Sequence, residues 1–155
     1  MKKYELTEET VTVYGKTLYR IRAVRDFGSV KTGEFGGYIE KKENLSHFGD
    51  AWVYGNAKVY GDARVSGNAR VYGNAEVFNT RHFFVQGPIG SRDGYVTFYR
   101  TKDDTVEVRC GCFSGSLQEF VNQVEETHGG SRYEKEYKLA AELAKVCIRL
   151  EGESR

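Results

Sequence analysis

Three histidines and three cysteines are the side chains of this 155-residue chain best suited to acid–base or metal chemistry. A histidine can act as a general base, and three converging imidazoles can bind a metal ion. The separations of His47, His82 and His128 do not match those of a metal site. Cys110 and Cys112 form a C-x-C pair, which is a poorer zinc half-site than a C-x2-C pair, and no fourth ligand accompanies them. We therefore expect no metal, no cofactor and no catalytic residue.

A glycine-rich loop over 87–94 is a second candidate for chemistry. The loop offers backbone amides, the Ser91 hydroxyl and the Arg92 guanidinium, and arginine binds phosphate and carboxylate groups well. Arg100 and Arg109 lie on the strands expected to follow. We predict a binding site for a small anion formed by Ser91, Arg92, Arg100 and Arg109. A plain turn with solvated arginines is the alternative.

A six-residue repeat is the most regular feature of the chain. From Gly49 to Phe78 the sequence reads GDAWVY, GNAKVY, GDARVS, GNARVY, GNAEVF. Strands repeat every two residues and helices every 3.6, so neither explains glycine and valine at every sixth position. A three-sided coil does, with a short strand on each side and a glycine turn at each corner. Phe83 and Ile89 continue the period, and we predict a parallel β-helix of about three coils over 39–90.

One turn of such a coil would contain 18 residues, so residues 18 apart should lie against each other. Tyr54 should contact Tyr72, and Tyr60 should contact Phe78. These aromatic pairs would form an apolar patch larger than a soluble monomer usually exposes. We therefore predict that all four rings lie at an interface between identical subunits. Packing of the chain's own tail over the rings is the alternative.

The segments on either side of the repeat predict other elements. Residues 1–38 contain two β-rich runs joined through Gly15, which indicates a β-hairpin that caps the repeat. Residues 91–155 predict an α+β tail with two strands, over 95–100 and 105–110, followed by two helices.

Each of the two helices should begin at a capping box, Ser116–Glu119 in the first and Ser131–Glu134 in the second. Leu139, Leu143 and Val146 widen the apolar stripe of the second helix. This helix is therefore expected to be buried on two sides or to lie at an oligomer contact.

The hexads, together with the segments Ile21–Phe27, Gly36–Ile39 and Glu43–Ser46, resemble the hexapeptide-repeat superfamily. The similarity is greatest to an uncharacterised polymer-forming subgroup found in bacteria and in phages or prophages. The resemblance implies a left-handed β-helix, commonly trimeric. Bulky residues such as Tyr54 follow the valine of most hexads, where the superfamily usually has a small residue. They would leave less room for the pantetheine arm used by its acyltransferases.

From these features we expect a non-enzymatic oligomeric binding protein. The resemblance implies a phage or prophage accessory factor that acts in counter-defence by binding a nucleotide-like anion or a host protein. A hexapeptide-type acyltransferase that uses acetyl-CoA, with His47 or His82 as base, is one alternative. A purely structural oligomerisation scaffold is another.

Composition narrows the partners and the compartment. The formal net charge is +1, whereas nucleic-acid binders normally carry a clustered basic excess. No run approaches the roughly 20 apolar residues that span a bilayer, so we expect neither a nucleic-acid nor a membrane partner. An odd number of cysteines and no signal-peptide pattern predict the cytoplasm, or the host cytoplasm for a phage protein.

Overall fold

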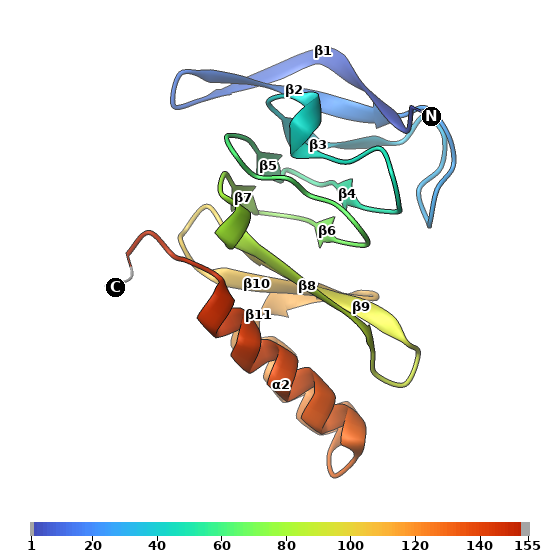
Figure 1. Ribbon diagram of the computed structural model, residues 1–155, viewed down its shortest axis with the longest axis vertical. Helices are drawn as coiled ribbons and strands as arrows, with labels where there is room; N and C mark the ends of the chain where they lie inside the picture. The colour runs from blue at the N-terminus through green and yellow to red at the C-terminus, as the bar shows by residue number, and fades with distance from the viewer. Residues whose placement is uncertain (1, 153–155) are drawn as a thin grey trace. The chain divides into compact units, whose positions relative to one another are not determined.

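The computed structural model describes residues 2–152. The chain divides after Thr80 into two compact units, each described by itself below. The first unit is coloured blue to green in Figure 1, and the second runs from green-yellow to red. Among residues 2–152, no helix is long and apolar enough to cross a membrane.

The first unit begins with an antiparallel hairpin. β1 (Tyr4–Val13) and β2 (Lys16–Ala23) pair around the Tyr14–Gly15 turn. Both turn residues have a positive φ, 49° and 77°, as a two-residue turn of type I′ requires. β3 (Phe35–Ile39) pairs antiparallel with β2. The predicted N-terminal hairpin is confirmed.

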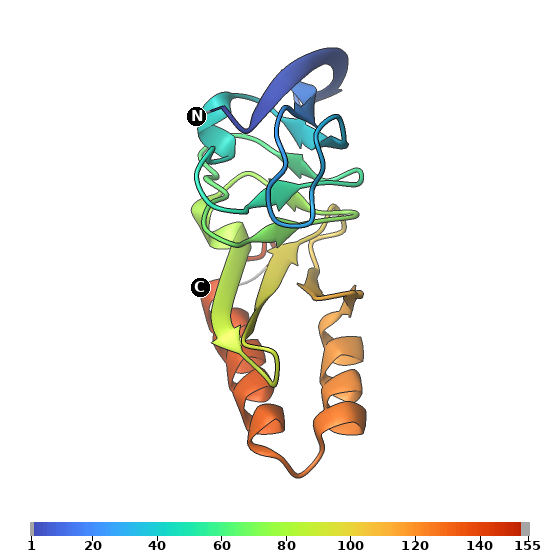
Figure 2. The same cartoon turned by 90° about the vertical axis from the view of Figure 1, so that its right-hand side faces the viewer.

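The hexads form short parallel strands after the 3-10 turn η1 (Lys42–Asn44) (Figures 1 and 2). β4 (Trp52–Val53) pairs with β6 (Arg70–Val71), in a sheet of their own. β5 (Lys58–Val59) lies between β3 and β7 (Glu76–Val77), parallel to both. The larger sheet is therefore mixed, in the order β1-β2-β3-β5-β7.

Residues eighteen apart lie side by side in this unit. Val53 pairs with Val71 across β4 and β6, and both are fully buried. The Tyr54 and Tyr72 rings are 4.6 Å apart, and those of Tyr60 and Phe78 are 5.2 Å apart. These predicted contacts are confirmed.

Glycine is required at the corners between the short strands. Gly49 has a φ of 69°, which costs glycine little and other residues more. A Cβ atom at Gly49 would also lie 2.7 Å from the carbonyl oxygen of Gly67 in the adjacent layer. The conformation and the close approach together explain why the hexads begin with this residue.

The predicted fold class, a left-handed parallel β-helix of about three coils, is wrong. The five-stranded sheet is mixed and the four-stranded sheet is antiparallel, and each parallel strand pair joins only two residues of each strand. The hairpin contributes antiparallel strands to the same sheet as the hexads. Phe83 and Ile89, expected to extend the repeat, lie in β8 (Phe83–Ile89), which pairs antiparallel with its successor. The repeat ends because no Gly-Asn-Ala corner follows Phe78. Instead, the 3-10 turn η2 (Thr80–His82) follows.

The second unit is a four-stranded antiparallel sheet with two helices. β8 is followed by β9 (Gly94–Arg100), β10 (Val106–Cys110) and β11 (Phe113–Ser116), in the order β11-β10-β9-β8. β9 and β10 match the predicted pair of strands. The prediction of only two strands in the tail is wrong, because β8 and β11 complete a four-stranded sheet. Residues 81–90, expected to close the repeat region, belong to this unit.

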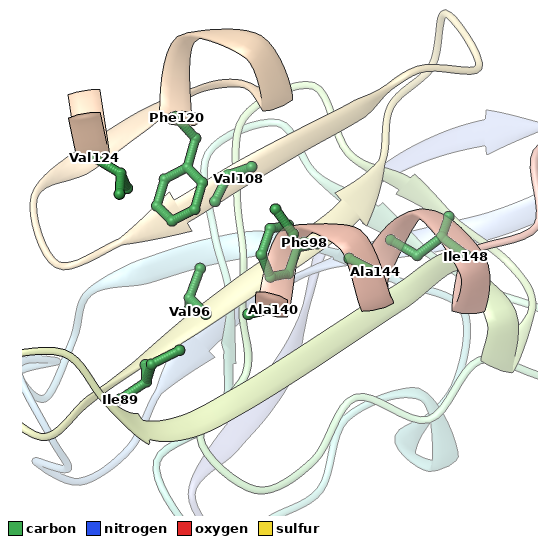
Figure 3. Close-up of a cluster of buried hydrophobic side chains, with 10 residues drawn as sticks. Ile89, Val96, Phe98, Val108, Phe120, Val124, Ala140, Ala144 and Ile148 are labelled. Carbon is green, nitrogen blue, oxygen red and sulfur yellow. The ribbon is translucent and has the colours of Figure 1, made fainter. Parts of the chain in front are cut away.

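The two helices, α1 (Leu117–His128) and α2 (Arg132–Cys147), begin after the predicted serines. The Ser116 side chain accepts the Glu119 amide, and Ser131 accepts the Glu134 amide. The complete reciprocal capping box forms at Ser116. The helices bury their apolar faces against one face of the sheet. The core includes Val96, Phe98, Val108, Phe120, Val124, Ala140, Ala144 and Ile148 (Figure 3).

Candidate functional site

A groove lies between the β8–β9 turn and α2, within the second unit. Its volume is about 530 Å³. The apolar part of the lining is Pro88, Ile89, Leu139, Ala140 and Leu143, and the polar part includes Ser91, Asp93, Arg132, Tyr133 and Glu136.

Two leucines of α2 are exposed in this groove. Leu139 is 63% exposed and Leu143 is 47% exposed. They are four residues apart and therefore adjacent on one side of the helix. Val146, one turn further, is 67% exposed. α2 packs in the core through Ala140 and Ala144, and Ile148, directly after the helix, belongs to the same core. Of the two alternatives predicted for α2, burial on two sides is wrong within this chain, because Leu139, Leu143 and Val146 are exposed. An oligomer contact stays a prediction.

The turn that forms the other wall is held by α2. The Gly90 amide donates a hydrogen bond of 2.9 Å to Glu136 Oε1. Gly90 has a φ of 80°, and a Cβ there would collide with the Tyr137 hydroxyl. Burial, followed by the neighbouring Cys110, raises the pKa of Tyr137 to about 12. The hydrogen bond to Glu136 and the close approach of Gly90 to Tyr137 hold this wall against α2.

The structure does not bring the four predicted anion-binding residues together. Ser91 lines the groove, and Arg92 follows it in the same exposed turn. Arg100 lies at the far end of β9, is 7% exposed and pairs with Asp104 at 2.9 Å. Arg109 lies opposite Thr97. Positions 97 and 100 are an odd number of residues apart along β9, so Arg100 and Arg109 point to opposite faces of the sheet.

The histidines occupy three different environments. His47 stacks on Tyr4, with ring centroids 4.1 Å apart. His82 is 2% exposed, and its Nε2 lies 3.6 Å from a Glu151 carboxylate oxygen. Burial, followed by the charge of Arg100, lowers the pKa of His82. His128 packs near Tyr137, with ring centroids 5.6 Å apart.

The three cysteines, Cys110, Cys112 and Cys147, are free thiols. Burial raises the pKa of Cys110, which favours the protonated thiol over the reactive thiolate. Among residues 2–152, no group of three or more His, Cys, Asp or Glu side chains is placed to bind a metal ion.

The residues predicted for an oligomer interface differ in accessibility. Tyr60 is 3% exposed and packs with Leu18 and Tyr38 of the hairpin and sheet. Its ring is therefore covered by residues of its own unit. Tyr54, Tyr72 and Phe78 are half-buried.

No protein-family model matches the chain, and no curated protein is significantly similar to it. The resemblance to the hexapeptide-repeat superfamily, and the oligomeric state it implies, therefore stay predictions.

The sequence had pointed to both walls of the groove, but for different reasons. Ser91 was expected there as an anion ligand, and Leu139 and Leu143 as part of an apolar stripe. The sequence did not show that α2 lies beside the β8–β9 turn, because residues 83–89 were assigned to the repeat and not to a strand of the second sheet.

Proposed function

We propose that this protein is a non-enzymatic binding protein, and that the groove between the β8–β9 turn and α2 takes a segment of another protein. The observation that carries the proposal is the exposure of Leu139 and Leu143 beside a groove of about 530 Å³. Fully burying a leucine side chain contributes about 1.5–3 kcal/mol. Covering these two, each about half-exposed, would contribute roughly 2–3 kcal/mol.

The charges around the groove favour a protein segment over a small anion. Arg132 is accompanied by Asp93 and Glu136, so the lining carries both signs. A site for a phosphate or carboxylate normally concentrates cations and amide donors. Arg100, the most buried of the predicted arginines, is already paired with Asp104. A lining that combines apolar side chains with charges of both signs is typical of a protein-binding surface.

The size of the surface favours a short segment over a second folded copy. Stable complexes bury about 800 Å² on each partner, and the exposed apolar stripe consists of Leu139, Leu143 and Val146. β8 is an edge strand that contains Pro88 and an irregular register between Gln86 and Ile89. Both features disfavour the addition of another strand. The groove is therefore suited to apolar side chains presented by a partner.

The remaining functional expectations stay predictions. They are an accessory role in phage counter-defence, assembly into a homo-oligomer, and the two alternatives of an acyltransferase and a structural scaffold. The two histidines give the acyltransferase little support as general bases, because His82 is buried and Nδ1 of His47 already accepts the Lys3 amide.

The proposal is tested by comparing proteins that co-purify with the wild type and with a Leu139→Lys/Leu143→Lys variant. Tyr14→Lys is the matched control, because Tyr14 is 85% exposed and lies in the first unit. We expect a partner with the wild type and the control but not with the groove variant. In calorimetry, the purified partner should then bind the wild type at least tenfold more tightly than it binds the groove variant. Equal binding to the groove variant would refute the proposal.

A further inference from the structure

The exposed residues of α2 follow the spacing with which one helix packs against another. Starting at Arg132, the positions 136, 139, 143 and 146 follow at intervals of four, three, four and three residues. Side chains spaced 3.5 residues apart on average form a narrow seam along one side of a helix. The last three positions of this seam are Leu139, Leu143 and Val146, which are exposed. The first two, Arg132 and Glu136, line the groove.

The seam offers a partner side chains but no backbone hydrogen bonds. In the interior of α2 the amides and carbonyls bond within the helix. The free edge of β8 contains Pro88, which has no amide hydrogen to donate. An extended segment laid along the seam would therefore leave its own amides and carbonyls without partners on that side. A helix satisfies its own backbone groups and presents only side chains, so it fits the seam better.

The charged residues of the groove differ in how far they are already engaged. Glu136 Oε1 accepts the Gly90 amide at 2.9 Å. Arg132 is exposed and forms no ion pair with the residues that the structure describes. Asp93, in the β8–β9 turn, disfavours a partner with many negative charges. One acidic side chain placed against Arg132 therefore complements this end of the seam.

We propose, as a refinement that rests on the proposed function, that the segment bound by the groove is an amphipathic α-helix packed along this seam. Its apolar residues recur at intervals of three and four residues. An acidic side chain about two turns away on the same face pairs with Arg132. α2 contains 16 residues, so a partner helix of about four turns covers the seam.

Selection from a phage-displayed library of random peptides tests this proposal without knowledge of the natural partner. The peptides contain about 16 residues, the length of α2, and the full chain is the bait. Peptides that bind the wild type but not the Leu139→Lys/Leu143→Lys variant bind the groove. We expect these peptides to share apolar residues spaced by three and four positions, with an acidic residue on the same face. A proline on the opposite face of a selected peptide should weaken its binding at least tenfold, because proline breaks the helix.

The outcomes separate the helical partner from the protein-binding groove itself. Groove-dependent peptides with apolar residues at every second position would overturn the helix but leave the groove as a protein-binding site. Groove-dependent peptides that tolerate proline would do the same. A selection that yields no groove-dependent peptide would overturn both proposals.

Charge reversal tests the contact with Arg132. In calorimetry at low ionic strength, Arg132→Glu should weaken the binding of a selected peptide at least threefold. Exchanging the acidic residue of the peptide for lysine should restore it. Lys145→Glu is the matched control, because Lys145 has the same charge on the same helix but lies outside the groove and pairs with Glu142 at 3.0 Å. This control should bind the peptide as the wild type does. Equal binding to Arg132→Glu and to the wild type would overturn the pairing with Arg132.

Discussion

Asn44 offers a sharp test of how the short parallel strands are held together. Its side chain is fully buried in η1. Nδ2 donates to the carbonyl oxygens of Gly61 at 3.2 Å and Ala63 at 2.9 Å, and Oδ1 accepts the Lys41 amide at 3.0 Å. One amide therefore satisfies three backbone groups, two in the hexad that begins at Gly61 and one at Lys41, just before η1. We predict that Asn44→Ala destabilises the first unit strongly.

The expected magnitude follows from the three partners that alanine would leave behind. An unsatisfied buried polar group costs about 1–3 kcal/mol. Gly61 and Lys41 are accessible enough for water to replace part of the loss. A value at the low end of this range, about 1 kcal/mol for each of Gly61, Lys41 and Ala63, gives about 3 kcal/mol in total. With a urea dependence of about 2 kcal/mol per molar, the unfolding midpoint should fall by roughly 1.5 M.

The assay is urea unfolding followed by the fluorescence of Trp52. Trp52 is the single tryptophan of the chain and is buried in the first unit, so the signal reports on that unit. Asn56→Ala is the matched control, because Asn56 occupies an exposed corner of a hexad. This control should change the free energy of unfolding by no more than about 0.5 kcal/mol. A shift for Asn44→Ala as small as for the control would refute the reasoning.

Three further predictions concern other parts of the chain. Because burial lowers the pKa of Lys3 from 10.5 to about 8, the unfolded state binds more protons than the folded state between these values. Stability should rise from pH 7.5 to 9.5, and a Lys3→Met variant that rose equally would contradict this. Gly90→Ala should destabilise the second unit by about 2 kcal/mol or more, owing to its positive φ and the collision with Tyr137. Thermal unfolding measures the effect, and Gly94→Ala serves as control, because a Cβ at Gly94 would meet open space. Equal destabilisation by the two substitutions would argue against the collision. Asp104 accepts the amides of Glu151 and Gly152, each at 2.8 Å, and these bonds hold its pKa below the ordinary value. This stabilisation is present above the ordinary pKa and is lost as pH falls through the lowered value. Asp104→Asn should speed hydrogen exchange at both amides about tenfold at pH 7. Unchanged rates would show that this pair of hydrogen bonds, the clamp at Asp104, does not hold the two amides.

The spacing of the hexads predicted the contacts between residues eighteen apart, but it did not predict where the repeat ends. Val53 and Val71 could be paired from spacing alone, because glycine corners and inward valines recur together. Phe83 and Ile89 also fit a period of six, yet six is a multiple of two. Residues six apart in one extended strand share a face, so the same spacing is satisfied by β8. The missing corner glycine was the signal that separated the two interpretations.

The anion site failed for a related reason. Arg100 and Arg109 are close in sequence and lie on neighbouring strands, so their convergence was a reasonable expectation. Which face each occupies depends on the register of β9 against β10, and a shift of one residue reverses it. The groove was only partly foreseeable, because Leu139 and Leu143 have the same spacing whether they are covered or exposed.

The clamp at Asp104 also bears on how the end of the chain can change over evolution. A carboxylate that grips two main-chain amides recognises no side chain at those positions. Substitutions at 151 and 152, proline excepted because it lacks the amide hydrogen, would leave the anchor intact, whereas one change at the distant aspartate would release it. Sequence drift at these two positions is therefore compatible with an unchanged attachment, and conservation should be sought at residue 104.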